Sequence, residues 1–288
     1  MSKISLYIKL MRPYQWVKNL FCFCGVVFGF HFFALGLLLK SLLCFLAFCC
    51  AASAVYVFND LLDAESDRKH PKKQNRPIAS GMVSVSDAKI LYAGLLLLAV
   101  LISLSVNLVV MLIVVTYVLS NVLYSLKAKH IVLLDVFFIS FGFLLRIFAG
   151  TYGIGIPQSE WLLLCAITLT LFLGFAKRRS EILQFEGDNT SSITRLVLQQ
   201  YEPRMLDILL AVTSATTIMS YALFIVIGKQ NHNLIYTIPF VIYGIFRYIY
   251  LLYQKSGGQD TANDLLDDKH LIVTVLLWVL SYLLFSYL

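Results

Sequence analysis

The stretch SLLCFLAFCCAASAVYVFNDLLDAESDRKHPKKQNRPIASG, residues 41–81, joins a long apolar run to a cluster of charges. Residues 41–62 are long and apolar enough to cross a membrane as a helix, because about 20 apolar residues span a bilayer. The part from Asp60 to Arg76 carries four carboxylates and five Lys or Arg residues. This charged segment therefore lies at a membrane edge, between two spanning helices.

The composition predicts a membrane protein. Apolar residues make up 59% of the 288-residue chain and charged residues 14%, whereas soluble proteins average about 25% charged. The mean hydropathy is +0.81. We predict an all-α integral membrane protein with one domain over residues 1–288. Nine apolar segments are expected, at residues 17–39, 41–62, 86–106, 108–126, 131–152, 160–180, 203–228, 233–253 and 270–288. The sequence SVSDAK, residues 84–89, predicts Ser84 or Ser86 as the N-cap of the third segment.

The basic residues predict the orientation. Nearly all of them fall in alternate connections, before segment 1 and between segments 2 and 3, 4 and 5, 6 and 7, and 8 and 9. The opposite connections hold little more than Lys40 and Lys229. The positive-inside rule then places the N-terminus and the charged loops on the cytoplasmic side. We expect a multi-pass protein of the plasma (inner) membrane. The net charge of +7 belongs to one membrane face and gives no indication of nucleic-acid binding.

Four polar residues at the end of segment 2 form a candidate metal site. On a helix, Asn59, Asp60, Asp63 and Asp67 would share one face because they are three or four residues apart; Glu65 would not. Carboxylates on one face repel one another unless a cation lies among them. Mg²⁺ prefers such oxygen ligands and keeps positions open for phosphates. The alternative is a charged, solvated helix end.

The basic residues after this acidic face are candidate phosphate ligands. Arg76, with Lys72 or Lys73, is placed to fold back over a metal and contact phosphate oxygens. Anionic lipid headgroups would attract the same side chains.

The sequence KRRSEILQFEGD, residues 177–188, is a second candidate site at the end of segment 6. Lys177, Arg178 and Arg179 are consecutive, so they fan around the helix and cannot all face one ligand. Glu181 lies four residues after Lys177 and is a candidate ion-pair partner for it.

Two shorter motifs complete the candidate set. In RPYQWVKN, residues 12–19, Pro13 suits a helix start, Gln15 and Lys18 share a face, and interfacial anchoring explains Trp16 and Arg12. The motif YSLKAKH, residues 124–130, is followed by Asp135.

Two arginines, Arg146 and Arg247, lie deeper in apolar runs, where charged groups usually face the bundle interior. For Arg146, a structural tether to a helix-end carbonyl and a catalytic role both remain open.

Other features carry no site. The six cysteines lie in apolar segments, and neither they nor the five histidines have zinc-ligand spacing. The sequence NDLLD recurs at residues 263–267, where its acids suit a helix N-terminus.

These motifs together resemble the UbiA superfamily of membrane prenyltransferases. The resemblance rests on NDLLDAESD (59–67), NRPIASG (75–81), YSLKAK (124–129) and LLRIFAG (144–150), and it covers most of the chain. It implies a nine-helix bundle with cytoplasmic cap loops. Aromatic prenyltransferases of this superfamily carry a second Asp-rich motif after helix 6, where this chain has KRRSEI. Because of this difference, and of the motifs RPYQWVKN and FRYIYL (246–251), the chain resembles the polyprenyl-phosphate phosphoribosyltransferases of the decaprenyl-phosphate type.

The resemblance implies a function in cell-envelope glycan synthesis. Members of that branch transfer 5-phosphoribose from phosphoribosyl diphosphate (PRPP) to a lipid phosphate. Mg²⁺ would be held by Asp60, Asp63 and Asp67, which are also the expected catalytic residues. The expected substrate-binding residues are Gln15, Lys18, Asn59, Arg76, Tyr124, Lys177 and Arg178. Apolar helix faces would contact the lipid chain or a second copy of the protein.

Two other functions are alternatives. An aromatic prenyltransferase making a quinone or haem precursor would use the same first motif, but the second acidic motif is missing. A transporter or channel would place its ionisable residues near the middle of the bilayer, whereas these acids lie at a membrane edge.

Overall fold

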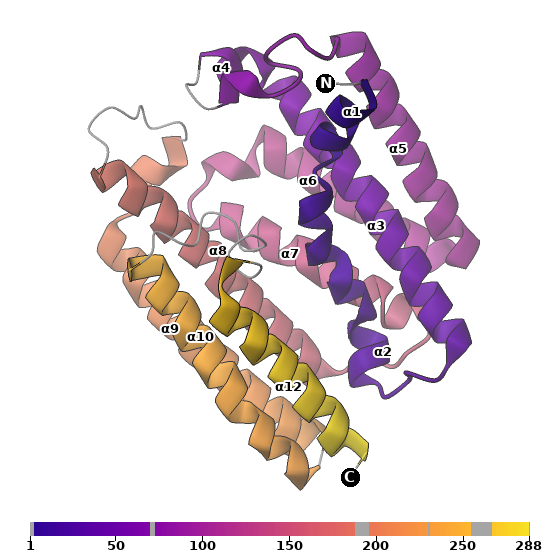
Figure 1. Ribbon diagram of the computed structural model, residues 1–288, viewed down its shortest axis with the longest axis vertical. Coiled ribbons are helices and arrows are strands. Elements are labelled where there is room, and N and C mark those ends of the chain that lie inside the picture. The colour runs from indigo at the N-terminus through magenta and orange to yellow at the C-terminus, as the bar shows by residue number, and fades with distance from the viewer. Residues whose placement is uncertain (1–2, 70–72, 188–195, 230, 255–266, 288) are drawn as a thin grey trace. The chain divides into compact units, whose positions relative to one another are not determined.

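The computed structural model describes residues 3–69, 73–187, 196–229, 231–254 and 267–287, and these ranges are helical with no β-strand. The all-α prediction is therefore confirmed for the described chain (Figure 1). The chain divides into two compact units, each described by itself. Unit 1 contains Met1–Leu126 and Leu145–Pro157, and unit 2 contains Lys127–Leu144 and Gln158–Leu288. The single domain over residues 1–288 stays a prediction.

Unit 1 is built around the long helix α3. Its elements are α1 (Lys3–Met11), η1 (Pro13–Phe23), α2 (Cys24–Phe28), α3 (Leu35–Leu62), α4 (Ala64–Arg68), η2 (Lys73–Asn75), α5 (Val85–Val106), α6 (Leu108–Leu126), the end of α7 (Leu134–Ala149) and η4 (Tyr152–Ile154). Helix α3 packs against α1, η1, α5 and α6. Helix α3 therefore runs through the core of unit 1 and ends next to α4.

Small residues allow close packing inside unit 1. Ala47, Ala51, Ala52 and Ala54 of α3 are buried, and small side chains let helices approach closely in a membrane. At Gly150 an added Cβ would lie 1.8 Å from the carbonyl oxygen of Cys22. Only glycine is compatible with this approach of two backbones.

Unit 2 has its own apolar core. Its elements are η3 (Ala128–His130), the start of α7, α8 (Glu160–Gly187), η5 (Leu196–Gln200), α9 (Pro203–Leu223), a π-helical turn (Phe224–Lys229), η7 (His232–Thr237), α10 (Ile238–Gln254) and α12 (Lys269–Tyr287). Helix α8 packs against α9, and α10 packs against α12. Phe172 and Tyr248 meet in this core with their rings 5.8 Å apart.

Eight helical segments of the described chain are long and apolar enough to cross a membrane. They correspond to predicted segments 2–9, with shifted ends. The helix predicted for residues 17–39 is wrong: η1 and α2 occupy residues 13–28, and α3 begins at Leu35. Phe30 has a left-handed backbone, with φ 59°, which ends a helix. Nine apolar segments are counted only if Pro13–Phe28 is taken as the first.

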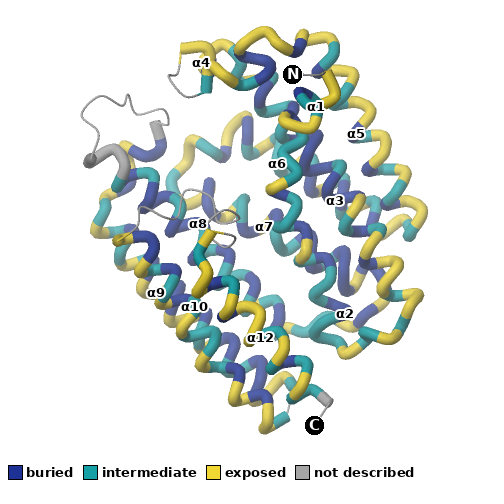
Figure 2. Tube along the Cα trace, viewed as in Figure 1, coloured by how far each residue is buried: buried dark blue, intermediate teal, exposed yellow. Residues whose placement is uncertain are grey.

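The exposed surface of the long helices is apolar. Figure 2 shows extended exposed stretches on α5 and α12. Their exposed residues include Leu97, Leu101, Leu276 and Leu280. Helices that face hydrocarbon need this pattern, because lipid tails are as apolar as leucine.

The start of α5 follows the sequence prediction. Ser84 is the N-cap, and its hydroxyl oxygen accepts a 3.0 Å hydrogen bond from the N–H of Asp87. Ser86, the other candidate, lies inside the helix.

Candidate functional site

The candidate metal ligands lie where α3 ends and α4 begins. Helix α3 stops at Leu62, and Asp63 leaves helical geometry with φ −89° and ψ 2°. The prediction that Asn59, Asp60, Asp63 and Asp67 share one face of a single helix is therefore wrong for Asp67. The carbonyl of Asp63 still accepts hydrogen bonds from the Asp67 N–H and the Ser66 hydroxyl, both at 2.8 Å. The first of these is the usual hydrogen bond between residues four apart in a helix, so Asp67 stays linked to Asp63 across the break between α3 and α4.

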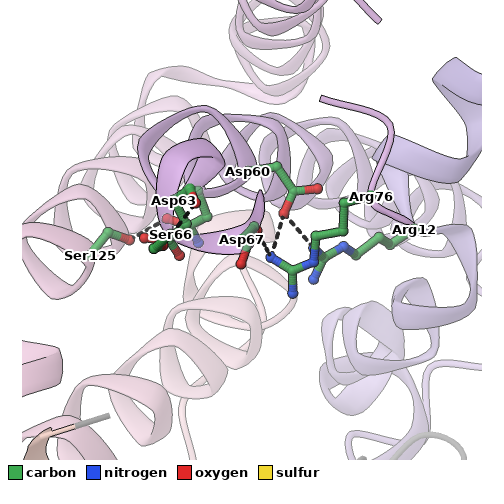
Figure 3. Close-up of polar contacts among 8 residues, drawn as sticks. Arg12, Asp60, Asp63, Ser66, Asp67, Arg76 and Ser125 are labelled. Atoms are coloured by element: carbon green, nitrogen blue, oxygen red, sulfur yellow. Dashed lines mark hydrogen bonds and ion pairs between the residues drawn. The ribbon is translucent and has the colours of Figure 1, made fainter. Parts of the chain in front are cut away.

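Asp60 and Asp67 converge on a single arginine nitrogen. Arg76 Nη1 lies 3.1 Å from Asp60 Oδ1 and 2.7 Å from Asp67 Oδ2. Both aspartates are buried, each with 3% of its surface exposed. Figure 3 shows the Arg76 guanidinium between them. The shared guanidinium offsets the charge of two buried carboxylates, since a buried charge is costly without a partner.

A second arginine, missed as a site residue by the sequence analysis, meets the same carboxylate. Arg12 Nη2 lies 2.6 Å from Asp60 Oδ1 (Figure 3). Its guanidinium carbon also lies 5.0 Å from the centre of the Tyr56 ring, within the range of a cation–π interaction. The sequence suggested only interfacial anchoring for Arg12. No local pattern indicated its partner, which is 48 positions away.

The junction that carries Arg12 is fixed to α3. Arg12 has a left-handed backbone, with φ 52°, and Pro13 begins η1 as predicted. Trp16 Nε1 donates to Ser53 Oγ, and Ser53 Oγ donates to the carbonyl of Met11, both at 3.0 Å. Trp16 thus helps hold this turn against α3, beyond the interfacial role predicted for it.

The YSLKAKH motif meets the acidic segment through Ser125. Its hydroxyl oxygen lies 2.5 Å from Asn59 Oδ1 and 2.8 Å from the carbonyl of Asn121. Tyr124 is half-buried beside it on α6. The ends of α3 and α6 are therefore neighbours, and the structure brings Asn59 close to the motif that holds Tyr124.

Gln15 and Lys18 lie on η1. In a 3₁₀-helix, side chains three residues apart are eclipsed, which confirms the prediction that these two share a face. Gln15 is buried and Lys18 is half-buried.

In unit 2, Arg178 is held by two carboxylates. Its Nε lies 2.6 Å from Asp135 Oδ2 and its Nη1 lies 2.5 Å from Glu181 Oε2. The arginine side chain is 1% exposed. Glu181, the candidate ion-pair partner for Lys177, pairs with Arg178.

Arg179 has a different partner from Arg178. Arg179 Nε lies 2.7 Å from Asp207 Oδ1, and Tyr253 also donates a hydrogen bond to that oxygen. Lys177 is half-buried. The three side chains thus fan around α8, as three consecutive helical residues must.

Asp135 is held by Tyr201 as well as by Arg178. The hydroxyl of Tyr201 donates to Asp135 Oδ1 and accepts a hydrogen bond from the Leu133 N–H, both at 2.7 Å. Burial, together with the hydrogen bond to Asp135, raises the pKa of Tyr201 well above its usual value. Tyr201 therefore stays protonated and remains a donor.

The two arginines in apolar runs both have partners. Arg146 donates from Nε to Asn19 Oδ1 at 2.7 Å and from Nη2 to the Tyr117 hydroxyl at 3.0 Å. Arg146 thus links η1 and α6 through side-chain contacts within unit 1. Arg247 forms a two-point ion pair with Asp268, at 3.1 and 2.7 Å.

Some predicted features lie outside the described residues. These are Lys72 and most of the repeated NDLLD at residues 263–267. Asp268, just after the repeat, accepts a 3.0 Å hydrogen bond from the Leu271 N–H at the start of α12.

The donor set fits a hard divalent ion in its chemistry. Asp60 and Asp67 direct carboxylate oxygens at one cationic group, Arg76 Nη1, and oxygen ligands suit Mg²⁺. Within the described residues, however, no three acidic, His or Cys side chains are already arranged to hold a metal. Metal binding would need the arginines to move and Asp63 to turn toward the pair.

The chain is similar to one protein family, to enzymes that share one name, and to a solved structure. The UbiA prenyltransferase family model matches residues 18–266. The decaprenyl-phosphate phosphoribosyltransferase of Corynebacterium glutamicum is 33% identical over 97% of this chain and 86% of its own length. The enzyme of the same name from Mycolicibacterium smegmatis is 32% identical over 96% and 91%. A UbiA homologue from Archaeoglobus fulgidus, solved with GPP and Mg²⁺, has a TM-score of 0.72 at 19% identity, covering 98% of this chain and 100% of that one. This last likeness shows the fold alone.

Proposed function

The chain belongs to the UbiA prenyltransferase family, and from this membership we propose that it is a phosphoribosyltransferase. It would transfer 5-phosphoribose from PRPP to a polyprenyl phosphate of the decaprenyl-phosphate type and release diphosphate. The lipid product would serve cell-envelope glycan synthesis. The observation that carries this proposal is the similarity, over nearly the whole chain, to two enzymes named for this activity.

The acidic segment supplies the chemistry that the reaction needs. We assign Mg²⁺ binding to Asp60, Asp63 and Asp67. The structures of the A. fulgidus homologue with Mg²⁺ support divalent metal use in the family. When bound, the ion would offset the negative charge of the leaving diphosphate.

The basic and polar residues would hold the donor. We assign Lys18, Arg76 and Lys177 to its phosphates, and Gln15, Asn59 and Tyr124 to ribose or phosphate oxygens. Arg178 was expected to contact phosphate as well. Because two carboxylates already enclose it, we assign it the task of positioning the end of α8, which carries Lys177.

The transfer would be a single displacement at C1 of the ribose. An oxygen of the lipid phosphate forms the new bond to C1 while the bond from C1 to the diphosphate oxygen breaks. The electron pair of that bond leaves with the diphosphate, and the transition state resembles the oxocarbenium ion of glycosyl transfer. The acceptor is already ionised, so no general base is required. Positioning and charge stabilisation by the named side chains would supply most of the rate, and the configuration at C1 would invert.

The membrane location follows from the substrates. The polyprenyl chain would contact the apolar surface of the helices, and soluble PRPP would enter from the cytoplasm. The basic connections support the cytoplasmic orientation through the positive-inside rule.

The decisive experiment is the transfer of radiolabelled PRPP into organic-extractable lipid. Purified protein is incubated with a short polyprenyl phosphate and Mg²⁺, with and without EDTA. We expect label in the lipid phase, loss of that label with EDTA, and loss in Asp60→Asn. Asp87→Asn is the matched control, because Asp87 is paired with exposed Lys3 on the surface.

Two results would contradict the proposal. Near-normal transfer in Asp60→Asn would remove the metal assignment. Absence of transfer, with coupling of a prenyl diphosphate to an aromatic acid by the same preparation, would identify an aromatic prenyltransferase.

A further inference from the structure

Two arginines neutralise the acidic pair in this structure. Arg12 and Arg76 both contact Asp60 Oδ1, at 2.6 and 3.1 Å, and Arg76 also contacts Asp67. We propose that Arg12 and Arg76 are exchangeable counter-ions, which leave the carboxylates when a divalent ion binds and transfer to the phosphates of the donor. This inference rests on the metal and diphosphate assignments of the proposed function.

The charge balance favours such an exchange. Asp60, Asp67 and the two guanidinium groups sum to zero formal charge, and both carboxylates are buried. Even with Asp63, the third assigned ligand, adding a divalent ion to the closed cluster would leave an uncompensated positive charge in a poorly solvated place, which is costly. A diphosphate brings the opposite charge, so binding of metal and anion together restores the balance.

The geometry points the same way. Arg76 Nη1 lies 2.7 Å from an Asp67 oxygen and 3.1 Å from an Asp60 oxygen. A Mg²⁺ ion binds its oxygens at about 2.1 Å. An ion that bound these two oxygens from the side of the guanidinium would overlap Nη1. Metal and arginine are therefore alternative occupants of that position.

Both arginines are placed to move a short way and stay close. The Arg12 and Arg76 side chains are 22% and 28% exposed, while the Asp60 side chain between them is 3% exposed. Part of each arginine side chain thus already reaches solvent. Tyr56 gives Arg12 a second contact, and the Arg76 carbonyl accepts hydrogen bonds from the Ser80 N–H and hydroxyl, at 2.9 and 2.8 Å. The backbone of Arg76 can remain fixed while its side chain turns.

Removing an arginine tests the first half of the exchange. Mn²⁺ binding to the purified protein, without any phosphate compound, is measured by electron paramagnetic resonance. We expect Arg12→Gln and Arg76→Gln each to bind Mn²⁺ about fivefold or more tightly than the wild type, within the usual range of coupling between ligands. Arg68→Gln is the control: Arg68 lies on α4 but donates to the carbonyl of Ala79, at 3.1 Å. It should change Mn²⁺ affinity by less than about twofold, because Arg68 is exposed and salt screens an exposed charge.

The opposite result would overturn the proposal. If the arginines only held the carboxylates in place, Arg12→Gln and Arg76→Gln would bind Mn²⁺ more weakly than the wild type. Thermal unfolding shows which variants are folded, and either arginine variant suffices for the test.

The second half is tested with inorganic diphosphate in EDTA by calorimetry. Asp60→Asn should bind diphosphate about fivefold or more tightly than the wild type, because it frees Arg12. In an Arg12→Gln background the same substitution should give a much smaller gain. An equal gain in both backgrounds would show a general charge effect and would overturn the proposal.

These measurements are independent of lipid turnover. Exchange without phosphoribosyl transfer would keep this inference and reject the proposed function. Phosphoribosyl transfer with weaker Mn²⁺ binding by the arginine variants would do the reverse.

Discussion

Arg178 and Asp135 form a 2.6 Å ion pair in which the two side chains are 1% and 0% exposed. They come from α8 and from the start of α7. Removing one partner of such a pair leaves the other charge buried alone. The pair thus ties these two segments together within unit 2.

We expect Arg178→Met to lower the free energy of unfolding by about 3–5 kcal/mol, as typically measured for a broken buried pair. Thermal unfolding in detergent measures the loss. Lys3→Met is the control, since the side chains of Lys3 and its partner Asp87 are 73% and 33% exposed, and exposed pairs contribute about 0–1 kcal/mol. Unchanged stability of Arg178→Met with lost transfer would instead place Arg178 in contact with the substrate.

Ser125 is expected to orient Asn59 for the donor. Ser125→Ala removes the 2.5 Å contact with Asn59 Oδ1, and a hydrogen bond of this kind contributes about 0.5–1.5 kcal/mol. We predict a fall in kcat/KM for PRPP of roughly two- to tenfold, since 1.4 kcal/mol is a factor of ten. Ser120→Ala is the control, because Ser120 on the same helix contacts only the carbonyl of Tyr117, at 2.8 Å. Equal effects of the two changes would exclude the role of Ser125.

Arg146 is expected to be structural. Tyr117→Phe removes its 3.0 Å hydrogen bond to Arg146, and bonds to charged groups contribute about 1.5–3 kcal/mol. We predict a lower unfolding temperature with transfer activity retained at temperatures where the variant is folded. Tyr152→Phe, at an exposed tyrosine, should leave the unfolding temperature unchanged. If Tyr117→Phe is folded and has lost transfer, a catalytic role for Arg146 is favoured.

The orientation can be read from labelling of intact cells. We expect a cysteine at Glu65, which is exposed beside the acidic cluster, to be protected from a membrane-impermeant maleimide. A cysteine at exposed Tyr152 should react. The wild type gives the background from the six native cysteines. Labelling at residue 65 but not at residue 152 would reverse the assigned topology.

The sequence by itself determined the membrane class and the positions of most spanning helices. Segments such as 108–126 follow from local hydropathy alone, because lipid selects apolar residues along the whole length of a helix. Local signals also predicted Ser84 or Ser86 as an N-cap, of which Ser84 is confirmed, and Pro13 as a helix start. The acids and bases between Asp60 and Arg76 indicated the candidate functional segment.

Only the tertiary structure decided which charges meet. Arg12 reaches Asp60 across 48 positions, and Arg178 turns to Asp135 across 43. No periodicity encodes such pairs, because they arise when helices pack and burial forces each charge to find a partner. The meeting of Asp60 with Asp67 is also decided by the tertiary structure. Helix α3 ends before Asp63, so the two carboxylates lie on separate helices. Both nevertheless contact the same arginine, Arg76.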